Sequence, residues 1–298
     1  MELASVRPRR FESLLGGLFF LCALISVLVS VAVIAVLLVE SVHFFEEVSP
    51  LEFLFGTEWS PIIEPKSYGV LPLVIGTLMI VLGAGLVALP VGLAIAIYLS
   101  EYAGAPRRRI IKPLLEVLAG VPTVVYGYFA LIVVTPALRS IFPETEIFNA
   151  ASAAIVVGIM ILPMVASLCD DALRTVPGSL RDAAYALGAT PLEVNTRIVL
   201  PGALSGVFAA FVLAIARAMG ETMAVTLAAG ATPTMDWQPL QSIQAMTGYM
   251  IQVSLGDNPS GSLIYHSLFA VAGVLFFTTL VLNLIAQKVM RQMREVYQ

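Results

Sequence analysis

An arginine and a glutamate lie four residues apart in an otherwise apolar segment, as Arg217 and Glu221 of the run RAMGET. Arg217 follows Pro201 by 16 residues, and this separation is about 24 Å along a helix at about 1.5 Å per residue. An arginine at that depth in a membrane costs at least about 2.5–3.5 kcal/mol, so we expect it to face a wet cavity or a partner charge. Guanidinium offers a planar fork of donors that suits an oxyanion. The segment therefore predicts an anion path, or alternatively an internal ion pair of Arg217 with Glu221 on the same helix face.

Three neutral side chains are candidates to complete this anion path. Thr222 follows Glu221 directly, and Thr123 and Tyr126 lie in a second apolar segment. Their hydroxyl groups can donate hydrogen bonds to an anion, although such hydroxyls also bond to the helix backbone or to neighbouring helices. The two cysteines and two histidines have no ligand spacing. We therefore expect no metal site, no cofactor and no enzymatic activity in this chain.

The composition of the chain indicates that transmembrane helices position these residues. Only 12% of the 298 residues are charged and 59% are hydrophobic, whereas a soluble domain carries about 25% charged residues. A transmembrane helix needs about 20 mainly apolar residues. Six charge-free intervals qualify, namely Ser13–Val39, Ser67–Ser100, Val117–Leu138, Ile147–Cys169, a stretch after Pro201, and Asn258–Gln287. The sequence predicts an all-α integral membrane protein with six transmembrane helices in lipid, and its basic residues form no patch for nucleic acid.

Lysine and arginine predict the orientation, because basic residues are retained on the cytoplasmic side. Two of them, Lys66 and Arg139, lie in loops on one side. Thirteen lie on the other side, namely Arg7, Arg9, Arg10, Arg107, Arg108, Arg109, Lys112, Arg174, Arg181, Arg197, Lys288, Arg291 and Arg294. We therefore expect both termini to be cytoplasmic. The acidic loops that contain Trp59 and Trp237 are then extracytoplasmic, with the tryptophans at the membrane interface.

The cytoplasmic loop of residues 177–201 contains two helix starts. Ser179 and Asp182 have the spacing of a capping box, and Gly188 can end the first helix in the left-handed conformation. Thr190 and Glu193 form a second box, with Pro191 suited to the first helical position. We expect a short helix, a glycine turn and a second helix that runs toward Leu200, before Pro201.

The first of these helices has a small apolar face. Its residues follow the spacing of one helix face and are Leu180, Ala183, Ala184 and Leu187. Such a face can dock into the groove of a partner protein. It can equally lie against lipid or against neighbouring spans, and patterning alone leaves both alternatives open.

The same loop resembles the EAA motif of ABC importer permeases. The residues that carry the resemblance are Asp182, Ala183, Ala184, Gly188, Ile198, Val199, Leu200 and Pro201. Aspartate stands where the motif usually has glutamate. The resemblance implies that the first helix, including Leu187, is a coupling helix that docks on an ATPase subunit. ATP hydrolysis is expected on that separate chain, because this sequence has no Gly-x-x-x-x-Gly-Lys-Ser/Thr phosphate loop.

Three further segments narrow the resemblance to the PstC family of phosphate-importer permeases. They are SYGVLPLVIGT from Ser67, LAGVPTVVYG from Leu118 and RAMGETMAVT from Arg217. The resemblance implies the type I ABC importer (MetI-like) fold in a prokaryotic cytoplasmic (inner) membrane. It also implies a PstA-like permease partner, two PstB-like ATPase subunits and an extracytoplasmic PstS-like phosphate-binding protein. The compact outer loop around residues 142–148 departs from the family.

These observations predict three regions and one function. Residues 1–66 form a cytoplasmic tail, an anchor and an outer loop; residues 67–290 form the permease domain with its coupling loop; residues 291–298 form a second cytoplasmic tail. The predicted function is one half of the translocation path of an ATP-driven phosphate importer. Glu221 can accept the proton that phosphate carries and repel sulfate, which has none. The alternatives are a permease for molybdate or sulfate and a secondary anion transporter.

Overall fold

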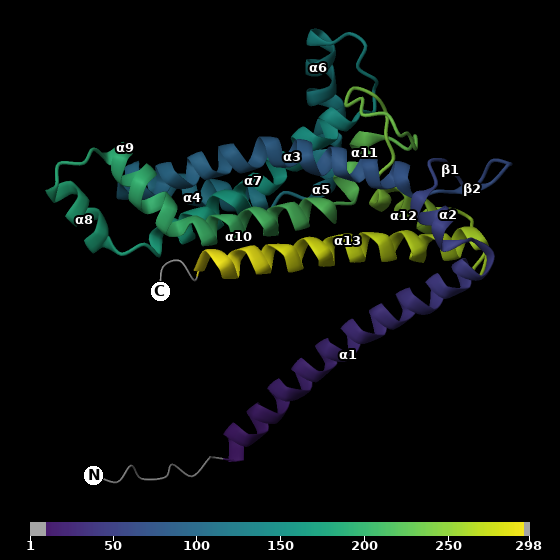
Figure 1. The fold of residues 1–298 in the computed structure, drawn as a ribbon, viewed down its shortest axis with the longest axis horizontal. Helices are drawn as coiled ribbons and strands as arrows, with labels where there is room; N and C mark the ends of the chain where they lie inside the picture. Colours follow the sequence, from purple (N-terminus) through teal and green to yellow (C-terminus); the bar gives the residue numbers. More distant parts are fainter. Residues whose placement is uncertain (1–9, 295–298) are drawn as a thin grey trace.

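The computed structural model describes residues 10–294, which are almost entirely helical (Figure 1). The elements in chain order are α1 (Arg10–Glu47), α2 (Pro50–Phe55), β1 (Trp59–Ser60), β2 (Ser67–Tyr68), α3 (Leu71–Ile97), η1 (Tyr98–Tyr102), α4 (Ala105–Ala119), α5 (Thr123–Phe129), η2 (Ala130–Val134), α6 (Thr135–Ile141), α7 (Ala150–Arg174), α8 (Gly178–Ala186), α9 (Pro191–Val194), η3 (Asn195–Val199), α10 (Leu200–Met219), α11 (Met223–Ala229), α12 (Met246–Leu255) and α13 (Leu263–Arg294). The segments η1, η2 and η3 are π-helical turns that continue neighbouring α-helices.

Six helical stretches in the described residues are long and apolar enough to cross a membrane, which confirms the predicted number of spans. They are Leu14–Glu47, Leu71–Tyr102, Thr123–Ile141, Ala150–Arg174, Pro191–Met219 and Leu263–Gln292. The third stretch begins later than expected, because the chain breaks between α4 and α5 at Gly120 and Pro122. Parts of the predicted cytoplasmic tails, residues 1–9 and 295–298, lie outside the described residues.

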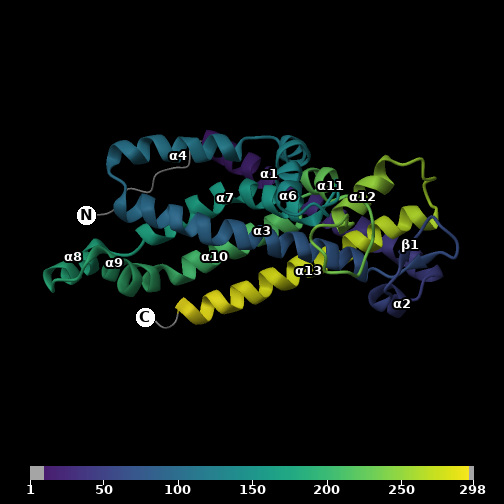
Figure 2. The same cartoon turned by 90° about the horizontal axis from the view of Figure 1, so that it is seen from above.

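The core of the bundle lies between α3, α7 and α10, which run side by side with α13 (Figures 1 and 2). Its buried residues are mostly alanine and valine. Small side chains let helix backbones approach closely where no hydrophobic effect drives association. A Cβ added at Gly92 of α3 would lie 2.6 Å from Cγ1 of Val165 in α7. The glycine therefore lets α3 pack directly against α7 at the centre of the bundle.

Helix α1 leaves this bundle at an angle (Figure 1). It meets α13 near its C-terminal end, where Nδ1 of His266 lies 2.9 Å from a carboxylate oxygen of Glu40. The apolar side chains from Leu14 to Val33 are exposed. Such a surface fits the lipid-exposed anchor that the sequence predicts.

Loops lie at both ends of the bundle, and α6 (Thr135–Ile141) projects from its side (Figure 1). Helices α8 and α9 lie at one end, and β1, β2 and α2 lie at the other. The two short strands pair antiparallel, with Trp59 opposite Tyr68. The prediction of an interfacial position is wrong for Trp59, because its indole is buried among Phe53, Tyr68 and Tyr249. Trp237 is exposed, as expected of an interfacial residue.

Candidate functional site

Helix α8 forms the first half of the predicted coupling loop. It ends as predicted at Gly188, whose φ of +86° lies in the left-handed region that glycine favours. The Gly188 amide donates to the carbonyl of Tyr185 at 3.0 Å. The predicted capping box of Ser179 with Asp182 is wrong. The helix begins at Gly178, directly after Pro177 and two residues earlier than the box requires, and no side chain caps it.

The second half of the loop begins with the predicted capping box. Oγ1 of Thr190 accepts from the Glu193 amide at 3.4 Å, and the Glu193 carboxylate accepts from the Thr190 amide at 2.9 Å. The helix does not stop before Pro201, as the sequence suggested. It continues through η3 into α10, where Pro201 occupies the first turn. Proline is tolerated inside this helix because a local π-helical turn and neighbouring groups can satisfy the carbonyl that loses its partner.

Only part of the predicted docking face of α8 is exposed in the structure. Leu180, Ala183 and Leu187 are exposed, and Leu187 keeps 90% of its surface accessible. Ala184 instead packs into the core of the bundle, while Asp182 is exposed. The loop therefore presents an apolar surface beside a carboxylate at the end of the molecule, and an exposed patch of this kind is typical of a protein interface.

A cavity of about 500 Å³ lies where α10 ends, and it contains both predicted charged residues. Its lining residues come from α4, α7 and the α10–α11 junction, and are Ala119, Met160, Met164, Ala216, Arg217, Gly220 and Glu221. Sequence reasoning missed the two methionines, since nothing in the spacing of α7 separates a cavity-lining residue from a core residue.

The predicted geometry of the charged pair is wrong, although the two residues do reach the same cavity. Helix α10 ends at Met219, so Glu221 does not continue the helical face of Arg217. Oε1 of Glu221 accepts a hydrogen bond of 3.2 Å from the Ala224 amide, in the first turn of α11. Within residues 10–294, Arg217 forms no ion pair with Glu221 or with any other carboxylate. Arg217 is exposed and Glu221 is 8% exposed.

None of the three neutral candidates is among the residues that line the cavity. The hydroxyl of the buried Tyr126 donates to the Leu118 carbonyl at 2.8 Å. The Thr222 hydroxyl donates to the Gly220 carbonyl at 3.1 Å. Thr123 begins α5 and is half-buried. For Tyr126 and Thr222, these contacts match the alternative of bonding to the helix backbone.

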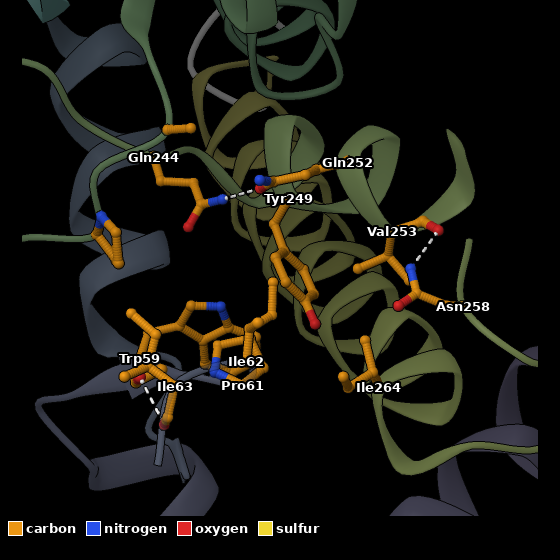
Figure 3. Close-up of a pocket in the computed structure, with 13 residues that line it drawn as sticks. Trp59, Pro61, Ile62, Ile63, Gln244, Tyr249, Gln252, Val253, Asn258 and Ile264 are labelled. Atoms are coloured by element: carbon orange, nitrogen blue, oxygen red, sulfur yellow. Dashed lines mark hydrogen bonds between the residues drawn. The ribbon is translucent and has the colours of Figure 1, made fainter. Parts of the chain in front are cut away.

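A second cavity, of about 190 Å³, lies at the end of the bundle that holds β1 and β2 (Figures 1 and 3). Trp59 and Tyr249 stand perpendicular to each other there, with ring centroids 4.8 Å apart. The Gln244 side-chain amide donates to Gln252 at 2.7 Å. The cavity lies between the loop after span one and α12. The contact of Trp59 with Tyr249 holds that loop against α12.

Several ion pairs lie at the end of the bundle that holds α8, and their pairings could not be predicted from the sequence. Nη2 of Arg108 lies 2.6 Å from the buried carboxylate of Asp170, to which Nε of Arg174 also donates at 3.1 Å. Nη2 of Arg181, in α8, lies 3.0 Å from the carboxylate of Glu101. One feature of the sequence does indicate that an ion pair forms here. Asp170 is a carboxylate at the end of an apolar span, and such a charge needs a partner.

Residues 88–294 match the family described as the inner membrane component of binding-protein-dependent transport systems. This match covers more than half of the chain, so the chain belongs to this family of transport permeases. One relative, the probable ABC transporter permease YqgH of Bacillus subtilis, is 32% identical over 92% of this chain and 89% of its own length. The phosphate transport system permease protein PstC of Mesorhizobium japonicum is 33% identical over 79% of this chain and 76% of its own length.

Solved structures confirm the MetI-like fold. A chain of a bacterial alginate ABC transporter superposes with a TM-score of 0.68 at 14% identity, over 95% of this chain and 96% of that chain. A chain of the MetNI methionine ABC transporter gives a TM-score of 0.56 at 19% identity, over 76% of this chain and 94% of that chain. At these identities the likeness concerns the fold alone.

Proposed function

We propose that the chain is the permease subunit of an ATP-driven phosphate importer and forms half of its translocation path. The observation that carries the proposal is the exposed, unpaired Arg217 in a cavity of about 500 Å³. A cation at this position needs a counter-charge, and the described residues supply none within ion-pair distance. A passing oxyanion supplies one. The relatives named as phosphate transport permeases favour phosphate among the oxyanions.

Glu221 has a defined place in this proposal. One carboxylate oxygen of Glu221 accepts a hydrogen bond from the Ala224 amide, and this bond fixes the Glu221 side chain at the cavity. The other oxygen is then positioned to accept the proton of a phosphate hydroxyl. Sulfate has no such proton near neutral pH and meets an unfavourable negative charge instead. Arg217 attracts either anion, and Glu221 selects the protonated one.

The exposed face of α8 is the proposed docking site for an ATPase subunit. Leu180, Ala183 and Leu187 would enter an apolar groove of that subunit, and Asp182 would lie at its rim. Two PstB-like ATPase subunits are proposed, one for each permease chain of the complex. The loop then lies in the cytoplasm, which places both termini on that side.

The relatives named as phosphate transport permeases support the remaining proposed partners. A homologous PstA-like permease would close the cavity from the other side. A PstS-like binding protein would deliver phosphate at the end that holds β1, β2 and the cavity of Figure 3. The complex would lie in a prokaryotic inner membrane.

Uptake of radiolabelled phosphate into vesicles that contain all proposed subunits tests this function. Wild-type uptake should require both ATP and the binding protein, and Arg217→Met should lower it about ten- to a hundredfold. Parallel assays with sulfate and molybdate test the alternative oxyanions. Uptake that an ion gradient drives without ATP would overturn the proposal in favour of a secondary transporter.

A further inference from the structure

Arg181 is the residue of the coupling loop that is most extensively bonded to the transmembrane helices. It lies on α8 directly before Asp182, and its guanidinium group makes four hydrogen bonds. Two reach the carboxylate of Glu101, from Nε at 3.3 Å and from Nη2 at 3.0 Å. The other two reach the carbonyls of Val176, at 2.6 Å, and Leu173, at 2.9 Å. One side chain therefore bonds to two different spans.

The partners of Arg181 lie at the loop ends of spans two and four. Glu101 belongs to η1, the π-helical end of span two, 80 residues away in the chain. Leu173 belongs to the last turn of α7, and Val176 follows it before α8 begins. A bidentate guanidinium–carboxylate contact fixes orientation as well as distance. The contact therefore restricts how α8 can move relative to α3 and α7.

The pair is shielded from water, which distinguishes it from an ordinary surface ion pair. The side chains of Arg181 and Glu101 are 18% and 9% exposed. Surface pairs contribute little because solvent screens them, whereas a shielded pair keeps its geometry. The neighbouring α4 is joined to the same region, since Arg108 donates to the Leu99 carbonyl at 3.3 Å and to Asp170 at 2.6 Å.

We infer that Arg181 is a positioning residue that fastens the coupling helix to the ends of spans two and four, so that a displacement of α8 moves these spans with it. This inference rests on the proposed function, in which an ATPase subunit displaces α8. Leu180 and Leu187 are exposed and stay free to dock. Docking and transmission thus use different residues of one short helix.

The test compares Arg181→Met and Glu101→Met with Arg109→Met in the complete complex in vesicles. Arg109 is a matched control because it is an exposed arginine at the same end of the bundle and lies outside the coupling loop. The first two variants should still bind the ATPase and hydrolyse ATP, but the phosphate transported per ATP should fall about tenfold. Arg109→Met should keep the wild-type ratio. A wild-type ratio in either test variant would overturn the inference.

The double variant Arg181→Met with Glu101→Met separates transmission from stability. If the pair serves stability alone, two apolar side chains can replace it and restore the ratio. If Arg181 transmits motion, the double variant stays as uncoupled as Arg181→Met, because the bonds to Leu173 and Val176 are also lost. Arg181→Lys keeps the charge without the fork of donors, so it should give an intermediate ratio. If the other variants fail to assemble, a wild-type ratio in Arg181→Lys would overturn the inference.

A second readout does not depend on phosphate. A cysteine at Ala119, which lines the cavity, should change its reactivity toward a thiol reagent when ATP is added to the wild-type complex. Arg181→Met should remove this change while ATP hydrolysis continues. If wild-type uptake of phosphate fails but the ATP-dependent change persists, the proposed substrate is wrong and the linkage stands. A change that persists in Arg181→Met, or that is absent from the wild type, overturns the linkage.

Discussion

Replacing Arg217 with methionine should lower anion uptake about ten- to a hundredfold without weakening the folded complex. Arg217 is exposed in the cavity and forms no ion pair among residues 10–294. Its removal should therefore change the free energy of unfolding by no more than about 0.5 kcal/mol. Each hydrogen bond from a charged donor to the anion contributes about 1.5–3 kcal/mol. Loss of one such bond should lower kcat/KM for phosphate about ten- to a hundredfold.

Variants of Glu221 distinguish an anion site at Arg217 from an internal ion pair of Arg217 with Glu221. Glu221→Gln keeps a side-chain oxygen for the Ala224 amide, so α11 should lose only the electrostatic part of its cap, about 0.3–1 kcal/mol. This variant should retain some phosphate uptake and begin to accept sulfate, because the repelling charge is gone. The double variant with Arg217→Met should be as inactive as Arg217→Met alone.

The assay is uptake of labelled phosphate and sulfate by the three variants, normalised to the amount of assembled complex. Thermal unfolding of the purified complexes checks the expected stability. Restored phosphate uptake in the double variant would refute the reasoning, because it would mean that the two charges only neutralise each other. A fall in melting temperature with Arg217→Met would likewise show that Arg217 has a structural partner.

Three further predictions concern the loop, a hydroxyl and the orientation. Gly188→Val should cost about 1–2 kcal/mol of local strain and uncouple ATP hydrolysis from uptake; since a Cβ there meets no atom within 4 Å, the defect is conformational, and unchanged uptake would contradict it. Tyr126→Phe should lower stability by about 1 kcal/mol and leave the KM for phosphate unchanged, whereas a raised KM would place this hydroxyl on the substrate. A cysteine at Asp236 should react with an impermeant thiol reagent from outside and one at Ser179 should not, and the reverse pattern would overturn the orientation.

The spans and the local turns could be predicted because their causes lie in short stretches of sequence. Hydrocarbon thickness sets the length of an apolar run, so the charge-free intervals identify the six spans. The left-handed Gly188 and the capping box at Thr190 depend on residues within one helical turn. The spacing of four residues predicted that Arg217 and Glu221 lie at one site, and the structure brings both to one cavity.

The geometry of the site could not be predicted because it depends on breaks and on distant contacts. An isolated glycine such as Gly220 is tolerated in a helical pattern, so RAMGET reads as continuous helix. Only the structure shows that α10 ends before Glu221. The pairing of Arg181 with Glu101 spans 80 residues, and the burial of Trp59 depends on its contact with Tyr249 in α12. No periodicity encodes such partners.

A continuous helical rod joins the coupling loop to the cavity. It begins at Pro191, passes through η3 into α10 and ends at Met219, with Arg217 in its last turn. At about 1.5 Å per residue the rod is about 40 Å long, so a tilt of about 5° at the loop would move Arg217 by about 3 Å, the length of a hydrogen bond. Glu221 lies beyond the end of the rod. Its carboxylate bonds to α11 and its carbonyl accepts from Thr247 of α12 at 2.9 Å. In the proposed function, a displacement of the loop therefore moves the cation while the carboxylate stays in place, and this change can release a bound anion.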